Sequence, residues 1–334
     1  MLDVNQSLTN VSAELQYQGL LERVMFSTLT TAPCCVFLFI NLTMLFTLRS
    51  KPVFCETSRY VLLFNLLFAD TTQMALSQLM YILAACRIRL TYPVCGVLTM
   101  LGELTSEISP LTLVLMSLER YVAVCYPLRH ATIVTIRNTG LAVLLVWAFS
   151  SLNILIRVVL LLDFPFSELE SLQMKDFCNT LGMFLGTVSD FYDKAYTGFL
   201  FVSAGVAVTS SYIGVMVAAR SASTDKASAQ KARNTLLLHV VQLGLSLSST
   251  IHNPMLIAVS KVLDRFIIVR IQIVIYVCII ILPRCLSSVI YGLRDRTIRP
   301  VLRYHLCCQW RRSPSVSDVP IKAKICLQLI DINS

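Results

Sequence analysis

Residues 138–162 read NTGLAVLLVWAFSSLNILIRVVLLL, a run in which Arg157 is the only charged side chain. About 20 to 25 residues of α-helix cross a hydrocarbon core about 30 Å thick, which matches the length of this run. Backbone polar groups cannot stay unpaired in lipid, so a run this long and continuous forms a helix. The stretch therefore predicts a transmembrane helix.

The rest of the chain repeats this pattern. Its 334 residues are 56% hydrophobic and 14% charged, with a mean hydropathy of +0.71. Soluble domains carry roughly 25% charged residues. The composition predicts an all-α membrane protein, a seven-transmembrane helix bundle that leaves no room for a large catalytic domain outside the membrane. The predicted spans are residues 24–48, 58–84, 95–125, 138–162, 195–219, 234–259 and 266–291.

Lysine and arginine residues set the expected orientation, because cytoplasmic loops hold the excess of them. Bases such as Arg49, Lys51 and Arg129 flank the spans on one side, whereas the other side mixes fewer bases with acids. The amino terminus is therefore expected outside a multi-pass plasma-membrane protein, with Asn5 and Asn10 as glycosylation sites in two sequons. The net charge of +9 then reflects topology and anionic lipid, and no nucleic-acid partner is expected.

Enzyme signatures are missing from the sequence. It has only 11 glycines, with no glycine-rich phosphate loop, no HExxH motif and no paired CxxC motif. We expect no catalytic residues, no metal site and no cofactor.

The third predicted span carries the most specific pattern. Cys95 begins it and Glu119-Arg120-Tyr121 ends it, so that at ~1.5 Å per residue Cys95 and Arg120 lie about 37 Å apart. An arginine at this depth is commonly an interface anchor whose head reaches water. Glu119 before it and Pro127 beyond it favour a functional role.

These residues resemble the rhodopsin-like family of G-protein-coupled receptors, and the resemblance covers essentially the whole helical core. Within the family, residues 116–130, 231–239 and 282–295 are similar to odorant receptors of the fish type. Further matches follow in the family's order: Asn41 in span one, Asp70 in span two, Trp147 in span four, Ser211-Tyr212 in span five and Tyr291 at the end of span seven.

The resemblance implies a receptor that binds a small odorant-type ligand from outside and activates a heterotrimeric G protein inside. Glu119 would hold Arg120 at rest, and outward movement of span six would free Arg120 to meet Tyr212 and the partner. Tyr121, Pro127 and Tyr291 complete the expected activation switch.

The start of span six departs from the family pattern. Lys231 and Arg233 stand in this stretch, which offers no acid to clamp Arg120. The resting lock is therefore expected to be weak.

Three of the twelve cysteines, Cys86, Cys95 and Cys178, lie outside, where oxidising conditions permit a disulfide. The family resemblance implies that Cys95 pairs with Cys178, which would tie the second outer loop to span three. Cys86 remains a possible competitor. Most other cysteines, including Cys34 and Cys285, are interpreted as small buried apolar residues.

Asp70 and Arg284 are both expected roughly 14 to 20 Å deep in the membrane, counted from the inner ends of their spans. A lone charge there costs at least about 2.5 to 3.5 kcal/mol, so each needs a partner. In many family members the equivalent aspartate helps to hold a sodium ion. Our hypothesis is an ion pair in which Arg284 replaces that ion and acts in the switch; the alternative is a static structural pair.

Glu103 and Glu107 share one face of span three. They are interpreted either as groups lining a ligand pocket or as structural acids paired with Arg157, with Arg284 or with each other through a shared proton. If they face the pocket, cationic ligands such as amines become plausible. The other ligand-binding candidates are Gly102, Ser106, Tyr196, Phe199, Ser203, His252, Asn253 and Tyr276.

After Tyr291 the chain alternates basic residues with Ile298, Val301, Leu302 and Leu306. This pattern predicts a short amphipathic helix on the inner membrane surface. Cys307 and Cys308 follow as palmitoylation candidates. The expected divisions are an extracellular tail (1–23), the seven-helix domain (24–291), the membrane-surface helix (292–308) and a flexible cytoplasmic tail (309–334).

Other classes of membrane protein fit less well. Within the receptor class, the alternative is a receptor for a non-odorant amine. A transporter would also bury Asp and Arg side chains, but it commonly shows internal repeats, and the sequence has none that we can detect. A channel would need a polar pore stripe, and an intramembrane enzyme a catalytic constellation that His239 and His252 do not supply.

Overall fold

A computed structural model describes residues 2–162, 173, 178 and 187–221, and also 234, 237, 240, 241, 244, 274, 276–282, 284, 285, 288, 290, 292 and 297–302. Within these residues the only strand-like pairing is an isolated bridge between Thr91 and Gln173, so the described architecture is all-α, as predicted. The elements are α1 (Leu2–Ser50), α2 (Pro52–Cys55), α3 (Ser58–Ala85), α4 (Tyr92–Cys125), α5 (Pro127–Ile133), α6 (Ile136–Leu162), α7 (Thr187–Ser221) and a π-helix (Tyr276–Ile281).

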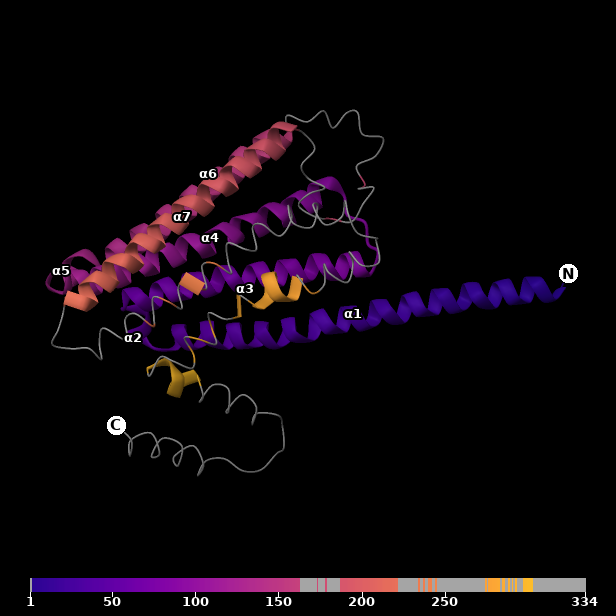
Figure 1. Ribbon diagram of the computed structural model, residues 1–334, viewed down its shortest axis with the longest axis horizontal. Helices are drawn as coiled ribbons and strands as arrows, with labels where there is room; N and C mark the ends of the chain where they lie inside the picture. Colours follow the sequence, from indigo (N-terminus) through magenta and orange to yellow (C-terminus); the bar gives the residue numbers. More distant parts are fainter. Residues whose placement is uncertain are drawn as a thin grey trace, which may run out of the picture.

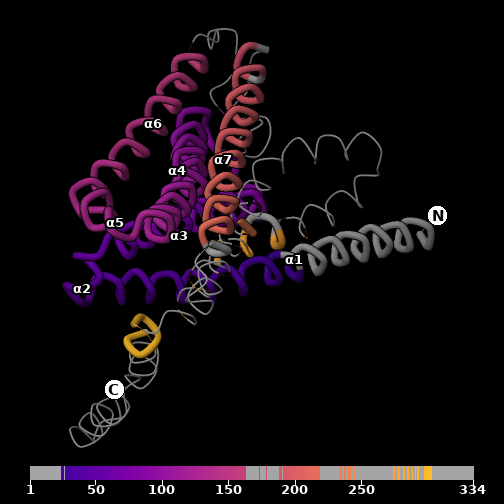
Figure 2. The backbone as a smooth tube through the Cα atoms, turned by 60° about the vertical axis from the view of Figure 1, so that its left-hand side comes forward, coloured from indigo at the N-terminus to yellow at the C-terminus, as the bar shows by residue number. Residues whose placement is uncertain are grey.

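Helix α4 lies at the centre of the described bundle. It packs against α3, α6 and α7, while α1 packs against α3. Figure 1 shows the long helices side by side, with α6 and α7 at one edge and α1 beyond α3. Figure 2 shows α6 and α7 on either side of α4. Side chains of α4 can therefore meet those of three other helices.

Helix α6 turns apolar side chains outward and polar ones inward. On α6, Leu144, Leu155 and Val159 are exposed, whereas Asn153 and Arg157 are buried. This polarity is the reverse of that of a helix on the surface of a soluble protein, and it suits a helix surrounded by lipid.

Four described segments are long and apolar enough to cross a membrane: Ser27–Ser50, Tyr92–Cys125, Ile136–Leu162 and Phe191–Ala218. Helix α3 has 28 residues but is not one of the four. Its hydropathy is lowered by polar residues, among them Asn65, Asp70 and Gln78, which are buried in the bundle.

Predicted and observed helix ends agree within three residues for α3, α4 and α6. Helix α1 begins at Leu2 rather than at residue 24, and Pro33 lies inside it. Helix α7 begins at Thr187 rather than at residue 195. Most of the predicted sixth span and much of the seventh lie outside the described residues.

The largest apolar cluster among the described residues joins several helices near the Ser50 end of α1. It contains Met44 and Leu48 of α1, Phe54 of α2, and Ile298 and Leu302 from the segment after the predicted seventh span. Residues 298–302 are helical, and Arg299 is exposed while Ile298 and Leu302 are buried. The amphipathic pattern predicted here is therefore helical where it is described, and its apolar residues share a buried cluster with residues of α1 and α2.

Candidate functional site

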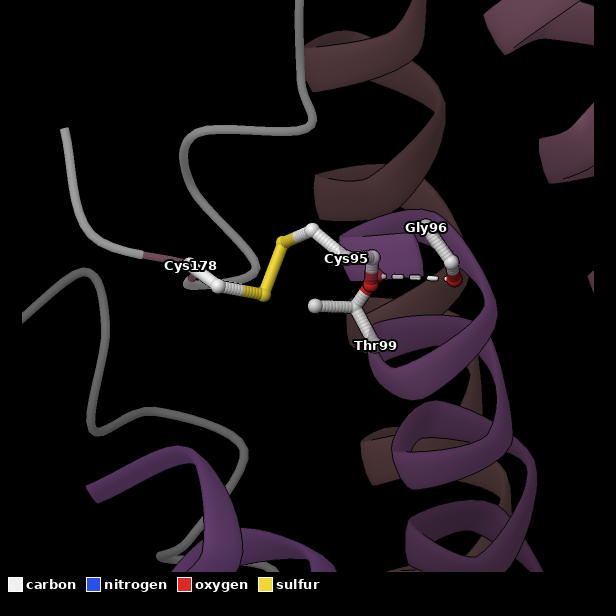
Figure 3. Close-up of a disulfide and its surroundings, with 4 residues drawn as sticks. All are labelled: Cys95, Gly96, Thr99 and Cys178. Carbon is white, nitrogen blue, oxygen red and sulfur yellow. Dashed lines mark hydrogen bonds between the residues drawn. A yellow bond between two sulfur atoms is a disulfide. The ribbon is translucent and has the colours of Figure 1, made fainter. Parts of the chain in front are cut away.

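One end of the bundle is fixed by a disulfide between Cys95, in the first turn of α4, and Cys178 (Figure 3). Their Cα atoms lie 5.6 Å apart, and both side chains are buried. One turn further along α4, the Thr99 hydroxyl donates to the carbonyl oxygens of Cys95 and Gly96, at 2.9 and 3.0 Å. The predicted pairing is confirmed, and Cys86 is a free, exposed cysteine.

A group that we call the outer polar cluster, after the orientation proposed below, lies between α4, α6 and α7, near the ends of α6 and α7 that adjoin residue 178. Arg157 Nη1 lies 2.6 Å from Asp193 Oδ1, and Arg157 Nη2 lies 4.0 Å from Glu107 Oε1. The guanidinium carbon also lies 5.9 Å from the centre of the Tyr196 ring. The members of the cluster are Glu107, Asn153, Arg157, Tyr192, Asp193 and Tyr196.

Hydrogen bonds occupy both carboxylate oxygens of Glu107. Asn153 Nδ2 donates to Oε1, and the Tyr196 hydroxyl donates to Oε2 at 3.1 Å. The Tyr192 hydroxyl donates to Asn153 Oδ1 at 2.7 Å. Buried carboxylates need such partners, and here α6 and α7 supply them.

Among the predicted ligand-binding residues, the structure brings together Glu107 and Tyr196. Gly102 is buried, and Glu103 and Ser106 are half-buried on the same helix. Phe199 and Ser203 were predicted to join them, but they are exposed. The Ser203 hydroxyl donates to the Leu200 carbonyl of its own helix at 3.2 Å. The structure does not bring these two residues into the cluster, and their place in a ligand pocket stays a prediction.

Three further ligand candidates belong to the predicted sixth and seventh spans. His252 and Asn253 lie outside the described residues, and of Tyr276 only the backbone is described, as the first residue of the π-helix. Sequence reasoning also missed Asn153, Tyr192 and Asp193, and it treated Arg157 only as a partner of the acids. The available signal was Asn153 and Arg157, two strongly polar residues one helical turn apart in a largely apolar span.

Three hydrogen bonds join α3 and α4 at successive levels, and we call them the α3–α4 polar ladder. Thr105 Oγ1 donates to Gln73 Oε1 at 2.7 Å, and Ser109 Oγ donates to Asp70 Oδ1 at 2.5 Å. Asn65 Nδ2 donates to Thr112 Oγ1 at 2.8 Å. On α6, Trp147 Nε1 donates to Asn65 Oδ1 at 2.8 Å, and this hydrogen bond joins α6 to the ladder.

Arg284 approaches the ladder from the predicted seventh span. Its Nη1 lies 3.7 Å from Asp70 Oδ1, and both side chains are buried. The pairing of Asp70 with Arg284 expected from the sequence is present. Nearby, the Ser288 hydroxyl donates to Asn41 Oδ1, which links the same span to α1.

At the opposite end of α4, Arg120 Nε lies 3.3 Å from Glu119 Oε2, and His130 Nε2 lies 3.8 Å from Glu119 Oε1. The predicted contact between Glu119 and Arg120 is present. Pro127 starts helix α5, where its missing N–H costs no hydrogen bond.

The Tyr121 ring lies against Gly214 of α7, where any larger residue would clash with it. Tyr212 is half-buried on α7, and Tyr291 lies outside the described residues. The Cys125 end of α4 therefore contacts α7 through an aromatic ring that packs against a glycine.

The geometry defines a class of protein: a membrane helix bundle tied by a disulfide at one end, with ion pairs inside and a Glu-Arg pair at the opposite end of the same central helix. The family model for the 7 transmembrane receptor (rhodopsin family) matches residues 40–304. The chain therefore belongs to this receptor family and is a multi-pass plasma-membrane protein with the family's seven-transmembrane bundle.

Three relatives support membership of the same receptor family. The chain is 32% identical to Odorant receptor 131-2 of Danio rerio over 307 residues, which cover 91% of each protein. It is 26% identical to Olfactory receptor 1500 of Rattus norvegicus over 40% of this chain and 43% of that protein. A 57-residue segment is 49% identical to Olfactory receptor 2A1/2A42 of Homo sapiens, covering 17% of this chain and 18% of the relative. Within its family the chain is odorant-receptor-like, and it belongs to a class of receptors rather than of enzymes.

Proposed function

We propose that this receptor binds a small odorant-type molecule from outside the cell and activates a heterotrimeric G protein at its inner face. The observation that carries the proposal is the arrangement of α4. The disulfide and Glu107 lie on the same helix that ends in the Glu119-Arg120 pair. Similarity to Odorant receptor 131-2 over 91% of both chains supports the odorant class of ligand.

The proposed orientation places the disulfide end outside and the Glu119 end inside. An extracellular disulfide suits an oxidising compartment. Exposed bases near the other end, including Arg49, Lys51 and Arg129, suit the cytoplasmic side. In this orientation Asn5 and Asn10 are glycosylated outside, and Cys307 and Cys308 are palmitoylated inside.

Activation in this proposal starts from the Glu119-Arg120 pair. In the resting receptor Glu119 engages the guanidinium through a contact of 3.3 Å, so Arg120 is less available to a partner. His130 of α5 shares the same carboxylate, which connects the pair to the loop after α4. A shift of the helices that separates Glu119 from Arg120 would free the guanidinium for Tyr212 and the G protein.

The Asp70-Arg284 pair is proposed as a second part of the switch. Arg284 supplies the positive charge that Asp70 needs, so no external cation is required at this level. Signalling is therefore expected to be insensitive to replacing sodium by potassium in the medium. A sodium dependence that disappears in D70N would contradict this role.

A second-messenger assay in cells, with panels of odorants and amines, tests the proposal. A ligand active on the wild-type receptor should lose its effect in R120Q at equal surface expression. The control R129Q removes an exposed base of α5 and should retain the response. Ligand-dependent uptake without any nucleotide exchange would instead identify a transporter.

A further inference from the structure

Arg157 lies among the chemical groups that recognise cations. Its guanidinium nitrogens lie 2.6 Å from Asp193 Oδ1 and 4.0 Å from Glu107 Oε1. Its guanidinium carbon lies 5.9 Å from the centre of the Tyr196 ring, so two other helices supply these groups. Carboxylates and aromatic faces are the groups with which proteins bind ammonium and guanidinium ligands. With only 4% of Arg157 exposed, the protein's own side chain fills this space.

We propose that Arg157 is a built-in cation that determines ligand specificity. It occupies the carboxylate and aromatic site of the outer polar cluster, so the receptor accepts ligands that present no ammonium group there. This inference rests on the proposed function, because it names the chemical class of the ligand. None of the site residues predicted from the sequence has this role of an internal cation that excludes ammonium groups.

The hydrogen bonds of the cluster support occupancy by Arg157. Both oxygens of Glu107 already accept hydrogen bonds, from Asn153 and Tyr196. An incoming ammonium group would have to displace these donors as well as the guanidinium. The acids that suggested an amine ligand from sequence alone are therefore engaged within the protein.

Removing the guanidinium should expose a cation site. Glu103, about one turn from Glu107 on α4, interacts electrostatically with Arg157 as Glu107 and Asp193 do. Without Arg157, these carboxylates would face one another in a bundle of low polarity, where like charges repel strongly. A small cation of the right shape would relieve that repulsion.

A ligand from outside has access to the edge of this cluster. The Asp193 side chain is 28% exposed, and Tyr192 and Tyr196 are half-buried. Asp193 lies in the second turn of α7 and Arg157 lies near the end of α6, so both adjoin the connection that carries Cys178.

The first test uses R157A in lipid nanodiscs and measures thermal unfolding with and without ethylguanidinium. Ethylguanidinium should raise the melting temperature of R157A and not that of the wild type. Its binding to R157A/D193N or R157A/E107Q should be about tenfold weaker or more, the discrimination expected of a charge-assisted hydrogen bond. K194A, which removes an exposed base beside Asp193, is the matched control and should show no effect of ethylguanidinium.

The second test measures activation by a series of alkylamines. R157A should gain amine responses with potency about tenfold or more above wild type, and these should vanish in R157A/E107Q. R157K keeps a cation in place and should not gain them. A purely structural role of Arg157 predicts a loss of stability without this gain.

Two results would overturn the proposal: no stabilisation of R157A by ethylguanidinium, or a wild-type amine response that weakens in E107Q or D193N. The second result does not depend on R157A and can be obtained even if that variant fails to fold. In that case, wild-type agonists that all lack an ammonium group would support the proposal. A wild-type receptor that activates no G protein with any ligand would refute the proposed function, while the unfolding test would still decide the role of Arg157.

Discussion

Replacing Asp70 and Arg284 singly and together should reveal strong coupling between them. At an effective dielectric constant of about 20, unit charges separated by 3.7 Å attract each other by about 4 kcal/mol. Each single substitution, D70N or R284M, leaves one buried charge without its main partner and should cost about 3 to 5 kcal/mol of unfolding free energy. The double variant removes both charges, so it should cost less than about 2 kcal/mol. Ser109 still finds an acceptor in the introduced amide.

The assay is a double-mutant cycle on receptor purified in mixed micelles, with unfolding free energies measured for all four proteins. A control cycle combines D70N with R137M, which removes an exposed base at the start of α6. The control pair should be additive within about 0.5 kcal/mol. If the Asp70-Arg284 cycle is equally additive, the 3.7 Å contact contributes no coupling and the reasoning fails.

Three further predictions concern other contacts of the described bundle. E119Q should raise ligand-independent nucleotide exchange, because Arg120 loses its carboxylate partner. The exchange is measured on membranes with a non-hydrolysable nucleotide, and unchanged basal exchange would argue against a resting lock. C178S should lower the unfolding free energy by about 4.5 kcal/mol in the chain-entropy model, since the disulfide joins residues 83 positions apart, and wild-type receptor in reductant should match the variant. W147F removes the donor to Asn65 and should cost about 1 to 3 kcal/mol; equal stability in the same unfolding assay would show that water replaces the bond.

The membrane helices could be predicted well where bilayer physics alone sets their ends. Helix α6 runs from Ile136 to Leu162 and the prediction was 138–162, because the hydrocarbon thickness fixes the length of an apolar run. The start of α7 was missed for an equally physical reason. Asp193 and Lys194 made this stretch read as a loop, yet Asp193 lies in helix and has Arg157 of α6 as its partner.

Residues of the site could be predicted from the sequence, but the rotation of α7 about its own axis could not. Glu107 stood out as an acid inside a span, and its burial followed from the cost of charge in lipid. The face that α7 turns toward Glu107 could not be inferred, because α7 carries apolar side chains on all of its faces. Tyr196 therefore lies in the cluster while Phe199 is exposed, although both lie on the same helix three residues apart.

The described contacts also indicate which helices are free to move. The α3–α4 polar ladder joins these two helices by three hydrogen bonds spread over several turns, so a relative shift of α3 and α4 would break all of them together. Arg284 and Arg157 reach this pair of helices from other parts of the bundle, each through an ion pair made by one long side chain. A long side chain can follow its carboxylate through a shift of an ångström or two, whereas a hydrogen-bonded ladder cannot. Switching is therefore expected to displace the predicted seventh span against a fixed α3–α4 unit, and Arg284 keeps Asp70 neutralised while the helices move.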